Sequence, residues 1–228
     1  MKGVLAYFSR FEWGLLLSSI AVGVLSELIS GSGGVLSLVA SVVGAFALIF
    51  TAKGNPLGQL LFIVFGVLYG IISYTFAYYG EMITYLGMSV PMAVVSLVSW
   101  LRHPSDEGRS EVKVGGLKRV DALLLPTLTV GLTVLFYFIL KLFGTANLLP
   151  STLSVTTSFV AVYLTFRRSP WYAFAYALND IVLILLWMLA ALADPSYLAV
   201  VVCFLVFLVN DAYGFINWRR MRKKQTDM

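Results

Sequence analysis

Long apolar segments alternate with short breaks of glycine, proline, serine and charged residues along the chain. A membrane-crossing helix needs about 20 mainly apolar residues to cover about 30 Å of hydrocarbon, and eight segments approach that length. Breaks such as GSGG at 31–34 and GNP at 54–56 are typical of turns between helices. The pattern therefore predicts eight membrane-spanning helices, over 11–29, 35–52, 57–79, 82–101, 120–143, 152–166, 171–192 and 197–218.

The composition supports a chain that lies in lipid. Of the 228 residues, 60% are hydrophobic and 12% are charged, against about 25% charged in a typical soluble domain. A soluble fold of this size would lack the polar residues to cover its surface. We therefore expect an all-α integral membrane protein with a single transmembrane domain over 1–228, and the composition excludes a soluble enzyme or a disulfide scaffold.

The basic residues indicate how the chain is oriented. With eight spans, fifteen of the sixteen Lys and Arg residues fall on one side, and Lys141 is the exception. Glu27, Glu81 and Asp194 mark the opposite side. Because cytoplasmic loops carry an excess of Lys and Arg, both termini are expected to be cytoplasmic. The net charge of +5 is thus assigned to orientation and to contact with membrane lipids, and not to nucleic acid.

Two parts of the chain resemble each other at a spacing of about 115 residues. VLSLVASVVGAFALIFTAKGNP (35–56) aligns with TLSVTTSFVAVYLTFRRSP (152–170), and both end in a basic residue and a proline. SWLRH (99–103) aligns with NWRRM (217–221), where an aromatic residue closes a helix just before arginine. An internal repeat explains these matches, and chance similarity among apolar segments is the alternative.

The repeat predicts an order of helices. Each unit contains three helices, one unit over 35–101 and the other over 152–218. An odd number of spans would invert the second unit, and the helix at 120–143 restores its orientation as a linker. An extra helix at 11–29 precedes the units, and a basic cytoplasmic tail at 219–228 follows them. Parallel units of this kind recur in transporters, which hold their substrate between the units near the midplane.

Two Asn-Asp pairs lie inside predicted spans. Asn179 and Asp180 belong to one helix, and Asn210 and Asp211 to the next. At 1.5 Å per residue, both pairs are roughly 12 Å from the cytoplasmic helix ends. An Asp near the bilayer centre costs about 2.5–3.5 kcal/mol on insertion scales, so these residues face the protein interior. Asp180 and Asp211 are deep enough to hold a coupling ion, but pairing between the two helices is the simpler, structural role.

Aromatic and amide side chains recur at helical spacing on the predicted spans. Such faces suit a flat, polar, aromatic ligand, because rings stack and amides fix its hydrogen-bonding edges. The alternative is structural, since Asn and Ser join helices in membranes and Tyr anchors helix ends. The candidate substrate-binding residues from these faces are Gln59, Tyr69, Tyr176, Asn179, Asn210, Tyr213 and Asn217.

Other chemistry is not indicated. His103, the single histidine, lies in a charged loop beside Pro104, so we expect neither a metal site nor histidine-based catalysis. The chain has no GxxxxGK[ST] phosphate loop, and we expect no cofactor. No nucleophile and base lie at one depth, which disfavours a membrane enzyme. A non-transporting structural subunit would explain the buried polar residues, but not the matching stripes in both units.

Several motifs resemble those of one family. FEWG near the start, FTAKGNPLGQ, FRRSPWYAFAYALNDIVLILLW and FLVNDAYGFINWRRM are similar to the PnuC-type nicotinamide riboside transporters, over about residues 10–221. The resemblance implies a three-plus-one-plus-three fold related to the SWEET proteins, in the plasma (inner) membrane of a bacterium. It implies import of nicotinamide riboside for NAD biosynthesis by facilitated diffusion, with trapping by a cytoplasmic kinase that need not touch the transporter. It also implies a homotrimer.

The same resemblance implies residue roles. Family members hold the nicotinamide and ribose with aromatic and amide side chains. Trp171 is followed here by Tyr172, where many members have closely spaced tryptophans, and this leaves open which ring stacks on the ligand. Relatives of the same architecture carry thiamine, riboflavin or deoxynucleosides, which are the alternative substrates. The carried-over residues are Gln59, Trp171, Tyr176, Asn179, Asn210 and Asn217.

Overall fold

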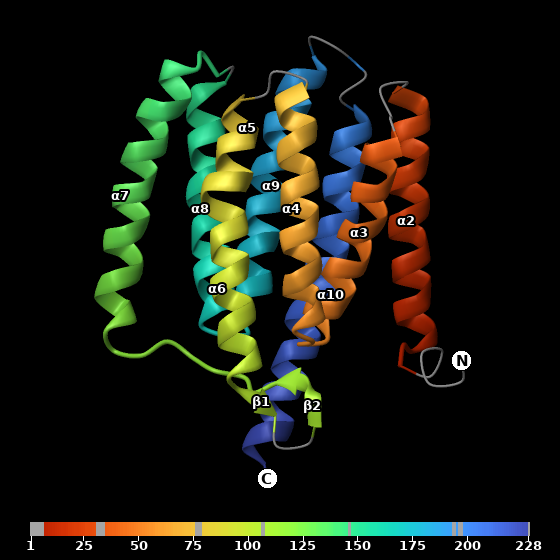
Figure 1. The fold of residues 1–228 in the computed structure, drawn as a ribbon, viewed down its shortest axis with the longest axis vertical. Coiled ribbons are helices and arrows are strands. Elements are labelled where there is room, and N and C mark those ends of the chain that lie inside the picture. The colour runs from red at the N-terminus through yellow and green to blue at the C-terminus, as the bar shows by residue number, and fades with distance from the viewer. Residues whose placement is uncertain are drawn as a thin grey trace.

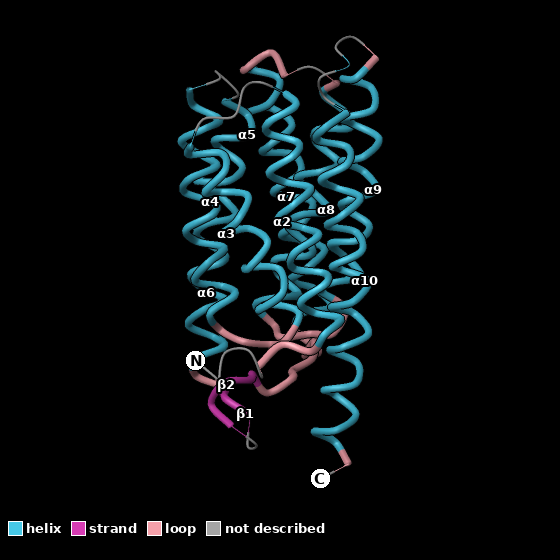
Figure 2. The backbone as a smooth tube through the Cα atoms, turned by 90° about the vertical axis from the view of Figure 1, so that its right-hand side faces the viewer, coloured by secondary structure: helices cyan, strands magenta, loops and turns pink. Residues whose placement is uncertain are grey.

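The computed structural model describes residues 7–30, 35–75, 79–105, 108–145, 147–192, 195 and 198–227, which form an upright bundle of helices (Figure 1). A small hairpin extends from one end of the bundle (Figure 2). The helices are α2 (Arg10–Ser30), α3 (Val35–Ala52), α4 (Leu57–Thr75), α5 (Tyr79–Thr84), α6 (Val90–Leu101), α7 (Asp121–Leu142), α8 (Leu148–Phe166), α9 (Tyr172–Ala191) and α10 (Leu198–Thr226). A π-helical turn, η1 (Tyr85–Ser89), joins α5 to α6, and the hairpin contains β1 (Pro104–Ser105) and β2 (Gly108–Val112).

Seven helical segments among the described residues are long and apolar enough to cross a membrane. One of them is Gly80–Leu101, in which α5, η1 and α6 follow one another without a break. The chain is therefore an all-helical, multi-pass membrane protein. Helix α2 runs beside α3 and α10 but is not among the seven. The count of eight spans stays a prediction, and the turn at 31–34 and Asp194 lie outside the described residues.

The predicted helix boundaries hold to within a few residues, with three differences. Helix α8 begins at Leu148 and not at residue 152, because Pro150 lies in the first turn, where backbone N–H groups have no partner within the helix. The charged loop that contains His103 holds the hairpin, and it fully buries Val112. The predicted tail from residue 219 continues α10 as helix to Thr226.

Six helical segments form a closed ring. Helix α3 packs against α4, and α4 against α6; in the second half, α8 packs against α9, and α9 against α10. The ring closes where α6 meets α8 and where α10 meets α3. Helix α7 packs on the outside of α8, and α2 on the outside of α3 and α10. This arrangement leaves the centre of the ring for a cavity.

Basic residues gather at the end of the bundle where the hairpin lies. We call this the basic end; it contains residues 53–56, 102–105, 108–120 and 167–171. The C-terminus and the first described residues lie there too (Figure 1). Lys141, in the last turn of α7, is at the opposite end.

The two segments that align in the sequence end in the same way. Gly54 after α3 and Arg168 after α8 both have left-handed backbone, with φ of 67° and 56°. The N–H of Gly54 donates to the Thr51 carbonyl, and the N–H of Arg168 donates to the Thr165 carbonyl, both at 2.9 Å. A left-handed residue just after the last helical turn is a common helix terminator. Glycine adopts it freely, and Arg168 adopts it at a conformational cost.

Two buried tryptophans join these helix ends crosswise. Trp100 at the end of α6 donates from Nε1 to the Thr165 carbonyl of the second half, at 2.9 Å. Trp218 on α10 donates from Nε1 to the Thr51 carbonyl of the first half, also at 2.9 Å. Both tryptophans are fully buried, and their ring centroids are 5.3 Å apart. We call Trp100, Trp218 and the two carbonyls the tryptophan clasp.

The residue before each tryptophan also donates a hydrogen bond to a carbonyl of the other half. The Ser99 hydroxyl donates to the Phe166 carbonyl at 3.1 Å, and the Asn217 amide donates to the Ala52 carbonyl at 2.9 Å. The clasp and these two bonds together bind two consecutive carbonyls at the end of each helix. They are Thr51 and Ala52 on α3, and Thr165 and Phe166 on α8. The Thr51 and Thr165 carbonyls also accept the N–H groups of Gly54 and Arg168. Side chains of the other half bind these two carbonyls a second time, and they also bind the carbonyls of Ala52 and Phe166.

The loop after β2 braces the same two turns. The N–H of Val112 donates to the Gly54 carbonyl, and the N–H of Gly115 donates to the Arg168 carbonyl, both at 2.9 Å. Gln225 on α10 holds this loop in turn, because its side chain accepts from the Val114 N–H and donates to the Val112 carbonyl. The extension of α10 beyond residue 218 is thus part of the fold of the basic end.

Buried ion pairs attach the two outer helices at the basic end. Asp121 at the start of α7 accepts from Arg167 at 2.6 Å and from the Tyr163 hydroxyl at 2.6 Å. Glu12 at the start of α2 pairs with Lys53 at 2.9 Å and accepts from the Tyr213 hydroxyl at 2.6 Å. The four charged residues of these pairs do not line the central cavity.

We predict that the clasp stabilises the fold. Trp100→Phe and Trp218→Phe each remove one N–H from a buried carbonyl and should lower the free energy of unfolding by about 1–3 kcal/mol. Thermal unfolding of the detergent-solubilised protein measures the loss. The control is Trp171→Phe, since Trp171 is 48% exposed and outside the clasp. If all three variants lose the same stability, the crossed hydrogen bonds are not what holds the two halves together.

Candidate functional site

A cavity of about 750 Å³ occupies the centre of the ring. Ligand pockets typically measure about 300–1,000 Å³. It is lined by the six ring segments and by the end of α7. Thr51, Gln59 and Thr165 line it near the clasp, while Glu81 and Asn147 line it near the opposite end. The fully buried clasp lies beyond the first group, so the cavity reaches from the clasp toward the end without the hairpin.

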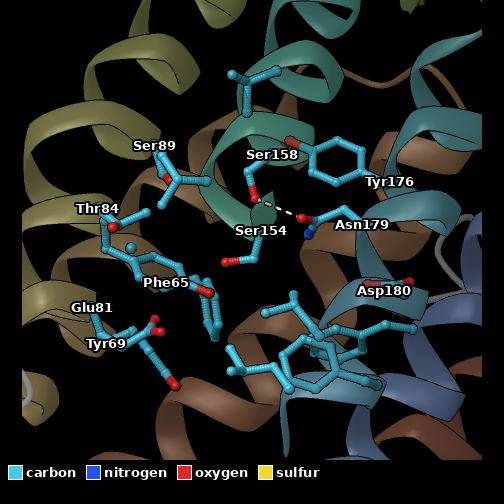
Figure 3. A pocket seen from close by; sticks show the side chains of 18 of the residues that line it. Phe65, Tyr69, Glu81, Thr84, Ser89, Ser154, Ser158, Tyr176, Asn179 and Asp180 are labelled. Carbon is cyan, nitrogen blue, oxygen red and sulfur yellow. Dashed lines mark hydrogen bonds between the residues drawn. The ribbon is translucent and has the colours of Figure 1, made fainter. Parts of the chain in front are cut away.

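Helix α8 presents a row of hydroxyl groups to the cavity. Ser151, Ser154, Ser158 and Thr165 all line it, and their spacing of three, four and seven residues keeps them on one helical face. In Figure 3, Ser154 and Ser158 lie between the wall formed by α4 and α5 and the wall formed by α9. The hydroxyls of Ser154, Ser158 and Thr165 donate to acceptors within the protein. Their oxygens can still accept hydrogen bonds, so this face suits a ligand that donates from hydroxyl groups.

Asn179 faces this row from α9 and is buried. Its side-chain oxygen accepts from the Thr157 hydroxyl at 2.7 Å and from the Ser158 hydroxyl at 3.0 Å (Figure 3). These two bonds fix the amide plane. The side-chain NH₂ group is then what Asn179 offers to a ligand oxygen.

An aromatic cluster forms the opposite wall. Phe65 and Tyr69 on α4 are stacked at 5.7 Å, and Tyr85 of η1 lies 4.5 Å from Tyr69 between ring centroids. Toward the clasp, the Gln59 amide donates to the Thr51 hydroxyl at 3.3 Å. Tyr176 on α9 completes the lining at this depth. A flat ring can therefore pack against aromatic faces while amides and hydroxyls meet its polar edges.

The charged residues of the lining are all acidic. They are Glu81, Asp180 and Asp211, from α5, α9 and α10. None of the described residues that line the cavity is Lys, Arg or His. Charged groups inside a membrane protein usually face cavities and substrate pathways. The cavity therefore favours a cation and disfavours a phosphate group, which usually requires Arg or Lys.

The structure places six of the ten candidate residues in the cavity. These are Gln59, Tyr69, Tyr176, Asn179, Asp180 and Asp211. The other four residues, which are Trp171, Asn210, Tyr213 and Asn217, are not part of its lining.

Each of those four has another contact. Asn210 donates to the Ser19 hydroxyl at 3.0 Å and so ties α10 to α2. Tyr213 binds Glu12, and Asn217 belongs to the exchange beside the clasp. Trp171 packs against Phe215, with ring centroids 5.5 Å apart, at the basic end.

Sequence reasoning missed most of the hydroxyl row and Glu81 as a lining residue. The serine spacing on α8 was a usable signal, because Ser151, Ser154 and Ser158 repeat every three or four residues. Glu81 was read only as a marker of the side opposite the basic loops. Its position one turn before η1 gave no sign that it faces the cavity.

Comparison with known proteins assigns the chain. The model of a family described as nicotinamide mononucleotide transporter matches residues 34–220. The chain belongs to this family. Members of the nicotinamide mononucleotide transporter family are transporters and not enzymes, so the cavity is the candidate substrate site of a small-molecule transporter.

Curated relatives of this transporter carry the name nicotinamide riboside transporter PnuC. The protein from Neisseria mucosa is 29% identical over 195 residues, which cover 84% of this chain and 74% of the relative. The protein from Haemophilus influenzae is 23% identical over 192 residues, which cover 83% of this chain and 81% of the relative. A crystal structure of the vitamin B3 transporter PnuC matches with a TM-score of 0.79 and 27% identity, over 96% of this chain and 94% of that one.

We predict that Asn179 contributes to ligand affinity. Asn179→Ala leaves a buried ligand oxygen without its amide donor, at a cost of about 1–3 kcal/mol, or about 5- to 150-fold in affinity. Titration with nicotinamide riboside, for which the curated relatives are named, measures this loss. Asn210→Ala is the matched control, because Asn210 contacts Ser19 outside the cavity. Equal loss of affinity in both variants would contradict the assignment.

Proposed function

We propose that this protein imports nicotinamide riboside, and not the mononucleotide after which the family is described. The observation that supports this most is the charge of the cavity lining, in which Glu81, Asp180 and Asp211 are acidic and no described residue is basic. Nicotinamide riboside carries one positive charge on its pyridinium ring and no phosphate. The mononucleotide adds a phosphate, which would meet only carboxyl groups and uncharged side chains in this lining.

The geometry also suits the rest of the molecule. The flat pyridinium ring matches the cluster of Phe65, Tyr69 and Tyr85, where stacking and cation–π attraction both favour it. Asn179 and Gln59 are amides that can bind its carboxamide. The ribose hydroxyls match the serine row of α8.

We propose that transport is facilitated diffusion by alternating access. In this mechanism, two parallel units, α3–α6 and α8–α10, tilt against each other around the cavity, with α7 as the linker and α2 as an extra helix. The matched turns at Gly54 and Arg168 and the crossed clasp support the repeat. The cavity extends away from the clasp, which supports a state closed at the basic end. Phosphorylation by a cytoplasmic kinase would then keep the substrate inside for NAD biosynthesis.

We further propose that the basic end is cytoplasmic, in the plasma (inner) membrane of a bacterium. The gathering of Lys and Arg at one end of the bundle supports this orientation. Many described apolar side chains on α7 are exposed, including Leu123, Val130 and Phe138. Such a surface suits lipid tails or a second copy of the chain, in keeping with the proposed homotrimer.

Thiamine is the second candidate substrate. It is also a flat aromatic cation without phosphate, so the acidic lining favours it over riboflavin and deoxynucleosides, which are uncharged. The carboxamide of nicotinamide riboside and its ribose hydroxyls match Asn179 and the serine row better.

The binding test is calorimetry on the purified protein. Nicotinamide riboside, nicotinamide mononucleotide, thiamine, riboflavin and a deoxynucleoside are compared in parallel. We expect the riboside to bind with micromolar affinity, about −8 kcal/mol, and the mononucleotide to bind at least about tenfold more weakly, about 1.4 kcal/mol. Tighter binding of the mononucleotide would reject the proposal. Binding of none of the five would favour a structural subunit.

The transport test uses proteoliposomes that contain no kinase. We expect labelled nicotinamide riboside to enter only until its inside and outside concentrations are equal, because uncoupled flux follows the substrate gradient. An imposed proton or sodium gradient should leave this end point unchanged. Accumulation of free substrate above the outside concentration would show ion coupling and overturn facilitated diffusion. Liposomes without protein are the control.

A further inference from the structure

Asp180 and Asp211 meet between α9 and α10 on the wall of the cavity. Their carboxyl groups are in contact with each other. They are 4% and 7% exposed. Asp180 Oδ2 is buried and accepts no hydrogen bond from any residue that the structure describes. Both residues belong to the lining of the cavity, and Figure 3 shows Asp180 beside Asn179 on its wall.

The contact between the two carboxyl groups requires a proton on at least one of them. A carboxylate only accepts hydrogen bonds, and a carboxylic acid also donates one, so the pair can be hydrogen-bonded only if one member holds a proton. Two carboxylates side by side in a buried site cannot both be ionised without a large repulsion. Two neutral acids would leave the buried pair without the charge-assisted hydrogen bond, which is roughly twice as strong as a neutral one.

The surroundings do not supply a counter-charge. The titratable groups that face the pair are the phenols of Tyr172 and Tyr176 on α9 and of Tyr85 on η1. Glu81 lies farther along the cavity toward Tyr85. No Lys, Arg or His of the described lining reaches the pair. A negative charge on the pair would thus have no cationic partner among the described lining residues, on the wall of the space that a ligand would fill.

We propose that Asp180 and Asp211 act as one unit that keeps one proton and one negative charge, and that this charge recognises a cationic aromatic ligand. This inference deepens the proposed function and rests on it. The proton stays on the pair when the ligand binds, so recognition needs no proton exchange and is compatible with uncoupled flux. A purely structural bridge between α9 and α10 would need the hydrogen bond but not the charge.

Substitution by asparagine can remove the negative charge of the pair while keeping a hydrogen bond between residues 180 and 211. Asp180→Asn or Asp211→Asn places an NH₂ donor where the shared proton lies and leaves the other carboxyl ionised, so each single variant keeps one hydrogen bond and one negative charge. The double variant Asp180→Asn/Asp211→Asn keeps a hydrogen bond, because an amide both donates and accepts, and it carries no charge. The three variants therefore test the pair as a unit.

The decisive experiment compares two ligands of nearly the same shape. Nicotinamide riboside is a cation, and its reduced dihydro form is uncharged. We expect each single variant to bind the cation within about threefold of the parent protein, and the double variant to bind it at least about tenfold more weakly, equivalent to about 1.4 kcal/mol. The affinity of all variants for the dihydro form should stay within about threefold of the parent.

Three outcomes would overturn the inference and leave the proposed function standing. Unchanged affinity of the double variant for the cation would mean that the charge is not used. Loss in each single variant as large as in the double variant would mean that the residues act separately. Equal loss of both ligands in the double variant would indicate a structural role. By contrast, failure of the parent protein to bind the cation would reject the proposed function itself.

A second measurement needs no ligand and no double variant. At neutral pH, infrared spectroscopy of the parent protein should show the carbonyl stretch of a protonated carboxylic acid. This band should disappear in both Asp180→Asn and Asp211→Asn, because the amide replaces the protonated member in each. Glu81→Gln is the matched control, since it tests the other carboxyl group of the lining. A band that survives in both Asp variants and vanishes in the Glu81 variant would overturn the shared proton.

Discussion

The fold depends on how the backbone is satisfied where the first helix of each half ends. In lipid, every buried backbone carbonyl needs a partner within the protein, and the carbonyls in the last turn of a helix have few partners within that helix. Trp100 and Trp218 fill this need crosswise, each donating to the half to which it does not belong. The two halves are therefore not independent bundles placed side by side, because side chains of each donate hydrogen bonds to the helix-end carbonyls of the other. The closed ring of six segments, and with it the central cavity, follows from this exchange.

The cavity combines three kinds of wall that come from different helices. Helix α4 and the π-helical turn supply aromatic rings, α8 supplies hydroxyls, and α9 and α10 supply amide and carboxyl groups. The π-helical turn at Tyr85–Ser89 is part of the aromatic wall, and such turns are frequent at functional sites. A chain of mostly apolar residues thus concentrates its polar chemistry in one enclosed space. The surrounding surface stays compatible with hydrocarbon.

Much of the architecture was predictable from the sequence, because each membrane-spanning helix is marked by a long run of apolar residues. Apolar runs of about 20 residues, glycine and proline breaks, and one-sided Lys and Arg fix the helices and their order with little dependence on detail. The site was less predictable, because a helical face has to be chosen for each polar residue. Asn179 and Asn210 lie at a similar predicted depth in the same Asn-Asp context, yet one faces the cavity and the other faces Ser19 on α2. Asn210 faces away from the cavity because its partner, Ser19, lies on α2. The spacing of residues within α10 does not reveal where α2 packs. Asn217 is similar, since its partner is a backbone carbonyl more than 160 residues away in the chain.

The place of α7 has a mechanical consequence. The covalent path from one half of the ring to the other leaves α6 through the hairpin, passes along α7 on the outside, and re-enters at α8. No peptide bond crosses either seam of the ring, at α6–α8 or at α10–α3. Relative tilting of the halves is therefore resisted by side-chain packing and hydrogen bonds alone, which break and re-form on microsecond to millisecond timescales. The covalent connection is itself attached to both halves at the basic end, where the N–H groups of Val112 and Gly115 donate to the carbonyls of Gly54 and Arg168, so the chain restrains the two halves at that end and not at the other.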